Sequence, residues 1–167
     1  MTPVSVVITG GARELAFCRR LLDPERGIRV VGVTRNGLEA LATVARLRPR
    51  VLLLDFGRPR LDALVALPLI RLRSPRTKVI LLTTPRTSDA LILEALSRGA
   101  QGYLDKAAIP TFLPKAVRAV DAGDAWVPRR MVSKILDRLI RLAAGERRGR
   151  GVGIRAIRAR ERRRQEW

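Results

Sequence analysis

The stretch LLLDFGRPRLDA, residues 52–63, decides the fold of this chain because it passes directly from an apolar run into a turn. Its aliphatic residues follow one another without polar alternation, as in a strand that helices cover on both faces. Asp55 ends the apolar run, and Pro59 follows four residues later. The pattern predicts a buried parallel strand with a candidate functional carboxylate at its carboxyl end.

Apolar runs and helix-type segments alternate along the rest of the chain. Five runs are expected to be strands: Val4–Thr9, Ile28–Val33, Val51–Asp55, Lys78–Thr83 and Gln101–Leu104. Segments with apolar residues at helical spacing follow them, at roughly 12–22, 36–48, 61–73, 87–98 and 111–122. Such alternation predicts an α/β fold in which a five-stranded parallel sheet is connected by right-handed crossovers.

The composition excludes several classes of function. The chain contains no histidine, which removes His-based catalytic triads and most zinc or iron sites. Its single cysteine, Cys18, excludes an internal disulfide and a multi-cysteine metal site. No apolar run approaches the length of a membrane span, and no signal peptide is evident at the N-terminus. We therefore expect a cytoplasmic protein without membrane contact.

The turn after the first strand resembles a dinucleotide-binding loop. The stretch VVITGGAREL, residues 6–15, supplies the beginning of the T-G-x-x-x-G-x-G pattern, but Glu14 and Ala16 stand where the later glycines should be. The enzymes with this pattern also need Tyr and Lys at positions i and i+4, whereas Tyr103 precedes Lys106 by three. A small NAD(P)-binding oxidoreductase is therefore kept only as an alternative.

Polar residues stand at the carboxyl ends of three predicted strands. Asp55 ends the third, Thr83 ends the fourth in KVILLTT, and Tyr103 and Lys106 end the fifth in GAQGYLDK. Because the carboxyl ends of parallel strands meet in one crevice, these side chains are expected to lie together. A carboxylate, a hydroxyl and an ammonium in that place could bind an anionic group carried by the carboxylate.

These residues resemble the receiver domain of two-component response regulators over residues 4–122. The segment DAGDAWVPRRMVSKIL, residues 121–136, is similar to the linker of the NarL/LuxR (FixJ) transcriptional subgroup. The resemblance implies a CheY-like (flavodoxin-like) doubly wound (βα)5 fold that is not an enzyme and whose protein partner is a sensor kinase or another regulator. It further implies that Asp55 is the phosphoacceptor, that Lys106 and Thr83 contact the phosphoryl group, and that Tyr103 changes rotamer in the switch.

The first strand departs from this family. Receivers carry an acidic pair there that holds Mg²⁺ together with the phosphoacceptor, and here the pair is replaced by Gly10 and Gly11. Mg²⁺ favours carboxylate oxygens, so we expect its binding to be weak or lost, with no other cofactor. The hypothesis is a pseudo-receiver, with a conventional phospho-accepting receiver as the alternative. Arg13 or Arg58 could supply fixed positive charge in place of the metal.

The C-terminal part of the chain departs from the family as well. The sequence predicts a receiver-like domain over residues 1–125 and an amphipathic linker helix over 126–144, whose apolar stripe (128–142) either packs back or forms a homodimer. Residues 145–167 form a basic tail, and residues 141–167 hold ten basic and three acidic side chains. The tail resembles the entrance to a helix-turn-helix domain and could contact nucleic acid nonspecifically.

Overall fold

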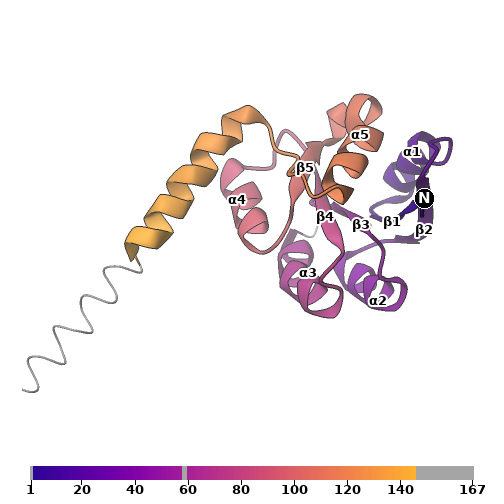
Figure 1. Cartoon of the computed structure of the whole chain (residues 1–167), viewed down its shortest axis with the longest axis horizontal. Coiled ribbons are helices and arrows are strands. Elements are labelled where there is room, and N and C mark those ends of the chain that lie inside the picture. Colours follow the sequence, from indigo (N-terminus) through magenta and orange to yellow (C-terminus); the bar gives the residue numbers. More distant parts are fainter. Residues whose placement is uncertain (1, 58–59, 146–167) are drawn as a thin grey trace, which may run out of the picture. The chain divides into compact units, whose positions relative to one another are not determined.

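The computed structural model describes residues 2–57 and 60–145, and within these a sheet of five parallel strands (Figure 1). The strands are β1 (Val4–Thr9), β2 (Ile28–Thr34), β3 (Val51–Asp55), β4 (Lys78–Thr83) and β5 (Gly102–Asp105). The helices are α1 (Ala12–Leu22), α2 (Gly37–Leu47), α3 (Arg60–Arg73), α4 (Asp89–Ser97), the short 3-10 helix η1 (Lys106–Ala108) and α5 (Ile109–Asp121). The predicted α/β architecture is confirmed, with each strand and its following helix in the expected order.

The strand order is β2-β1-β3-β4-β5. The chain therefore adds β2 on one side of β1 and then adds β3, β4 and β5 in turn on the other side. Helices α1 and α5 cover one face of the sheet, and α2, α3 and α4 lie on the other side (Figure 1). The register pairs Asp55 with Leu82 and Thr83 with Asp105, which brings the carboxyl ends of β3, β4 and β5 to one edge. This edge is the carboxyl edge of the sheet, and the opposite edge is the amino edge.

Both faces of the central strands are buried, as the apolar runs predict. Side chains at Val6, Ile8 and Leu53 belong to the core cluster beneath α1 and α5. Leu52 and Leu54, which flank Leu53 along β3 and point to the other face, are equally buried. Each such side chain contributes about 1.5–3 kcal/mol through burial. This two-sided core is why the strands read as continuous aliphatic runs.

The ends of the helices follow recognisable capping chemistry. The Asn36 side chain caps α2 by accepting a hydrogen bond from the Glu39 amide at 2.9 Å, and Glu39 Oε2 accepts one from the Arg35 amide. By contrast, Gly11 occupies the N-cap of α1 without a side-chain bond. Helix α5 begins earlier than predicted, because Pro110 stands in its first turn, where a proline is tolerated, rather than before the helix.

A short bridge closes the outer edge of β5. The Tyr103 amide donates to the Trp126 carbonyl at 3.0 Å, and the Trp126 amide donates to the Gln101 carbonyl at 3.3 Å. Gly102 makes this approach possible, since a Cβ there would lie 2.6 Å from the Trp126 carbonyl oxygen. The Trp126 ring also lies against Phe112, with ring centroids 6.0 Å apart.

Residues 128 onward form a second unit, separate from the one that ends at Val127. Within it, residues 129–145 are helical, and Val132, Leu136, Leu139 and Ile140 expose roughly half or more of their side chains. None of the helices in the described part of the chain is both long enough and apolar enough to span a bilayer.

Candidate functional site

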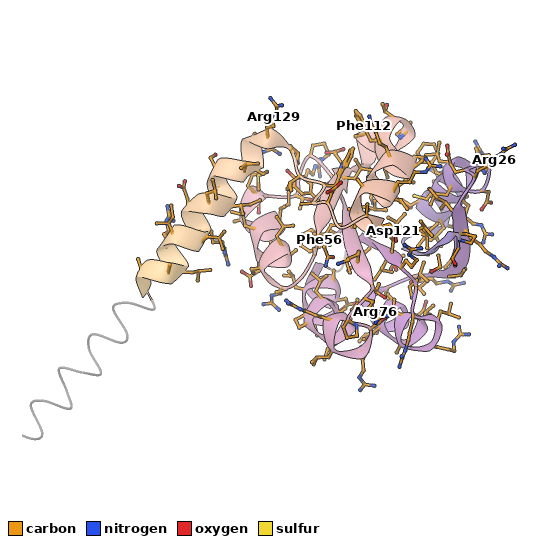
Figure 2. The ribbon with its side chains drawn as sticks, in the orientation of Figure 1. Arg26, Phe56, Arg76, Phe112, Asp121 and Arg129 are labelled. Atoms are coloured by element: carbon orange, nitrogen blue, oxygen red, sulfur yellow. The ribbon has the colours of Figure 1, made fainter. Side chains whose placement is uncertain are left out.

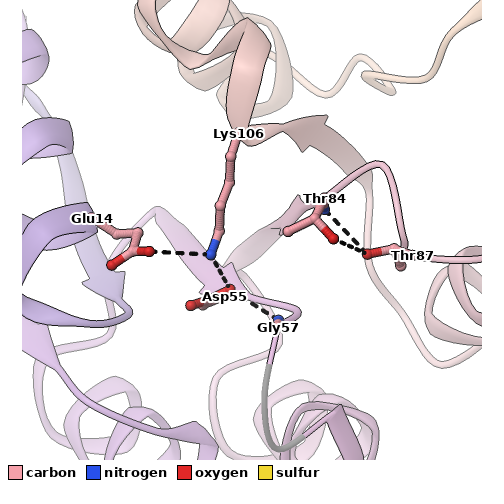
Figure 3. Close-up of polar contacts among 6 residues, drawn as sticks. All are labelled: Glu14, Asp55, Gly57, Thr84, Thr87 and Lys106. Atoms are coloured by element: carbon pink, nitrogen blue, oxygen red, sulfur yellow. Dashed lines mark hydrogen bonds and ion pairs between the residues drawn. The ribbon is translucent and has the colours of Figure 1, made fainter.

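Asp55 and Lys106 form an ion pair at the carboxyl edge of the sheet. Lys106 Nζ lies 3.0 Å from Asp55 Oδ1, and the same oxygen accepts a hydrogen bond from the Gly57 amide at 2.9 Å (Figure 3). Lys106 is positioned by the turn that follows β5, in which Asp105 Oδ1 accepts from the Ala107 amide at 2.8 Å. Two residues that the sequence places 51 positions apart are therefore brought together as predicted.

A second carboxylate, Glu14, joins this pair and was not among the predicted site residues. Its Oε1 lies 3.5 Å from Lys106 Nζ, so the ammonium stands between two carboxylates (Figure 3). Glu14 belongs to the first turn of α1, directly after the Gly10-Gly11 turn. Its position in the first turn of the helix that leaves β1 is the sequence signal that could have identified it.

The pKa of Lys106 is raised above its ordinary value by this arrangement. Burial alone would lower the pKa, because it disfavours the charged form. The hydrogen bond and charge of Asp55, followed by those of Glu14, outweigh the burial. Lys106 is therefore firmly protonated at neutral pH and acts as a fixed positive charge.

Gly10 and Gly11 lie beside the two carboxylates. A Cβ at Gly10 would stand 3.7 Å from Asp55 Oδ2, so an acid at this position would share the surroundings of Asp55. A Cβ at Gly11 would stand 2.8 Å from Glu14 Oε2. The Glu14 carboxylate therefore occupies space that a side chain at position 11 would need. Over residues 2–57 and 60–145, no three metal-binding side chains of the His, Cys, Asp or Glu type gather in one place.

The remaining predicted residues lie on neighbouring strands. Thr83 is buried at the end of β4, and Tyr103 is buried within β5. The next residue along, Thr84, is held in the β4–α4 turn, where its amide donates to Thr87 Oγ1 at 3.1 Å (Figure 3). Tyr103 lies in β5 and Lys106 in the short helix η1, so the two residues do not share one helix face. An oxidoreductase of the alternative class would need them on one helix face.

Of the two arginines suggested as replacements for the metal's positive charge, Arg13 lies within the described residues and Arg58 does not. Arg13 is exposed on α1 and makes no ion pair with any residue that the structure describes. Arg58 lies outside the described residues, as does the basic tail from residue 146 onward. Among the described residues, the positive charge that pairs with Asp55 comes from Lys106.

Comparison with known proteins agrees with this geometry. The family model of the response regulator receiver domain matches residues 13–118 of this chain. The transcriptional regulatory protein LnrK of Bacillus subtilis is 35% identical over 131 residues, which cover 78% of this chain and 56% of LnrK. The response regulator UvrY of Escherichia coli is 32% identical over 112 residues, covering 67% of this chain and 51% of UvrY.

Solved structures give the same result. The receiver domain of a response regulator NarL from Mycobacterium tuberculosis superimposes with a TM-score of 0.67 at 28% identity, over 74% of this chain and 99% of that one. The chain spans about half the length of the curated relatives described above. With its match over residues 13–118 and its NarL/LuxR-type relatives, this chain belongs to the response regulator receiver domain family.

Proposed function

We propose that this receiver is atypical and transmits its signal without ordinary Mg²⁺-dependent phosphorylation of Asp55. The observation that carries the proposal is that glycines, Gly10 and Gly11, stand at both positions of the acidic pair, beside an Asp55 whose charge is met by Lys106 at 3.0 Å. Asp55 is thereby neutralised by a side chain of its own domain. The activity follows from protein contacts, with a sensor kinase or another regulator as the partner.

The charges around Asp55 support this reading. Mg²⁺ requires near-octahedral oxygen ligands and is held through carboxylates. Within the part of the chain that the structure describes, the carboxylates paired with Lys106 are Asp55 and Glu14, and the ammonium lies between them. A divalent ion would have to enter next to that positive charge, which Coulomb repulsion opposes. The described residues are therefore a poor fit for the metal that phosphoryl transfer to a carboxylate requires.

The test restores the acids. We expect the wild-type chain to show no Mg²⁺ binding at millimolar concentration by isothermal titration calorimetry, and no phosphorylation by acetyl phosphate in intact-mass spectra. The Gly10→Asp/Gly11→Asp variant should gain at least tenfold in Mg²⁺ affinity, because it places carboxylates beside Asp55. The matched control, Gly10→Asn/Gly11→Asn, adds similar bulk without charge and should gain nothing.

Mg²⁺ binding by the wild-type chain at millimolar or better affinity, with phosphorylation that Asp55→Asn abolishes, would refute the proposal. That outcome would establish the second candidate, a conventional phospho-accepting receiver. The observation that favours this candidate is the Asp55–Lys106 pair itself, together with Thr83 at the end of β4, because these are the residues through which the family handles a phosphoryl group.

The C-terminal helix supplies a second part of the proposal. Its exposed apolar side chains, Leu136 and Leu139 among them, would form a homodimer contact between copies of the 128–142 segment. Sedimentation equilibrium of the full chain should show a concentration-dependent dimer that Leu136→Gln/Leu139→Gln weakens. Asp137→Asn, on the same helix, is the control. An unchanged equilibrium in the leucine variant would refute the contact.

A role in transcription is proposed from the relatives alone. LnrK is a transcriptional regulatory protein, and this chain matches only about half of its length. The DNA contact suggested by the basic tail belongs to residues that the structure does not describe. It is tested by the salt dependence of duplex binding before and after removal of residues 146–167, and an unchanged affinity would reject it.

A further inference from the structure

The amino edge of the sheet collects basic side chains from successive loops. The loops that enter β2, β3, β4 and β5 each contain arginine, and Arg29, the second residue of β2, and Lys78, the first residue of β4, add more. Figure 2 labels two of these residues, Arg26 and Arg76, on the loops before β2 and β4. The exposed or partly exposed basic residues of the entering loops and strand starts are Arg26, Arg29, Arg48, Arg50, Arg76, Lys78 and Arg98.

Acidic residues do not neutralise this edge. Asp23, Glu25 and Asp121 lie there, but each already pairs with an arginine: Arg19, Arg118 and Arg50, respectively. Asp124 follows the end of α5 and adds one further negative charge. Arg26, Arg29, Arg48, Arg76 and Lys78 make no ion pair with any part of the chain that the structure describes.

Helix dipoles account for only part of this charge. Basic residues in the last turn of a helix are stabilised by the negative end of its dipole, which explains Arg46, Arg71 and Arg73. Among the uncompensated residues named above, Arg48 is the C-cap of α2. The other four stand in loops or at strand starts, outside the last helical turns. They therefore form a charged surface that the stability of the helices does not require.

Arg48 provides an independent observation. It ends α2 with φ +46° and is the one non-glycine residue with positive φ among the described residues. Glycine is the usual residue at such a helix end, because a side chain is strained in this conformation. An arginine that is exposed at the amino edge thus stands at a position where the backbone favours glycine.

The chemistry of the edge fits phosphate oxygens. Guanidinium groups bind phosphate with two parallel hydrogen bonds. The distance from β2 to β4 is three strand spacings, about 14 Å, and a duplex presents one negative charge per about 1.7 Å of its axis. A recess of about 300 Å³, lined by Arg71, Thr77, Lys78 and Gly99, opens on the same edge. The surface is therefore large enough to meet several phosphates at once.

The four entering loops also disfavour other polyanionic surfaces. They contain no aromatic residue on which unpaired bases could stack, and no large aliphatic residue that could insert into a lipid headgroup layer. What they offer is charge and hydrogen-bond donors. We propose that the amino edge of the sheet docks on the phosphate backbone of duplex DNA without reading its sequence, through Arg26, Arg48, Arg76 and Lys78.

The test measures fluorescence anisotropy of a labelled mixed-sequence DNA duplex with the full chain between 50 and 200 mM salt. The Arg26→Gln/Arg76→Gln variant should bind about tenfold more weakly at low salt, and its log–log salt slope should fall by about two. The matched control, Arg35→Gln/Arg86→Gln, removes the same charge from exposed residues near the carboxyl edge. It should change the affinity less than twofold, while the basic tail is identical in all three proteins.

Arg48→Gly separates binding from folding. The substitution removes a proposed phosphate contact and relieves the positive-φ strain, so binding should weaken severalfold while the Tm is unchanged or higher. Equal losses in the edge variant and its control, or no loss in either, would overturn the proposal. So would tighter, edge-dependent binding to phosphatidylserine vesicles, or to an acidic polypeptide, than to the duplex at equal charge concentration. None of these results bears on Mg²⁺ binding at Asp55.

Discussion

Replacing Lys106 by Met gives the sharpest test of the ion-pair site. The substitution removes an ammonium that lies 3.0 Å from Asp55 Oδ1 and keeps most of the side chain's length. At an effective dielectric constant near 20, charges at this distance attract by about 5 kcal/mol before desolvation is subtracted. A hydrogen bond to a charged group contributes about 1.5–3 kcal/mol net. The contact with Glu14, which is 35% exposed, adds less than about 1 kcal/mol.

We therefore expect Lys106→Met to lower the free energy of unfolding by about 2–3 kcal/mol at neutral pH. The pKa of Lys106 is raised in the folded state, so its stabilisation is complete below the unfolded-state pKa near 10.4. It is lost as the pH rises through the folded-state pKa. The wild-type chain should therefore lose its advantage over the variant only above about pH 10.

Urea denaturation followed by far-UV circular dichroism measures these differences. Lys115→Met, at an exposed position on α5, is the matched control and should change stability by less than about 0.5 kcal/mol. In the Lys106→Met background, Glu14→Gln should be neutral or stabilising, because it removes a negative charge whose partner has gone. A cost below 0.5 kcal/mol for Lys106→Met, or an equal cost of Glu14→Gln in both backgrounds, would refute the reasoning.

Three further outcomes follow from the fold. Gly102→Ala should cost about 1–3 kcal/mol in thermal unfolding, because its Cβ would lie 2.6 Å from the Trp126 carbonyl oxygen, and an unchanged Tm would argue against the bridge. Burial raises the pKa of Cys18 to about 11, so the thiol of the native chain should resist Ellman's reagent at pH 8. It should react once the chain is unfolded in urea, and a fast reaction in the native chain would contradict its burial. Asn36→Ala should cost about 1 kcal/mol by removing the cap of α2, whereas Asn36→Ser should largely preserve stability.

The sheet could be predicted from the sequence because each strand carries its own signal. The aliphatic runs are continuous, and the turn residues between them fix where each strand ends. Once the sheet is known to be parallel, Asp55 and Lys106 must meet at the same edge, which the structure confirms at 3.0 Å. The pairing of these two residues is thus a consequence of topology.

Glu14 could not be placed in the same way. The predicted start of its helix at residue 12 agrees with Ala12, the first residue of α1. Which of its residues reaches a neighbouring strand also depends on how the helix is rotated, and the start position alone does not give that rotation. The basic amino edge was also missed. Its arginines are scattered through the sequence and become neighbours only when four loops lie along one side of the sheet.

The bridge at Trp126 has a consequence for self-association. An uncovered outer strand can recruit strands from other molecules and so start sheet-to-sheet growth. On β5, the Gln101 carbonyl and the Tyr103 amide are already engaged by the chain's own backbone, so an incoming strand would have to displace them. The opposite outer strand, β2, has no such cover among the described residues, and there Arg29 is an exposed charge of the kind that discourages stacking of strands into aggregates.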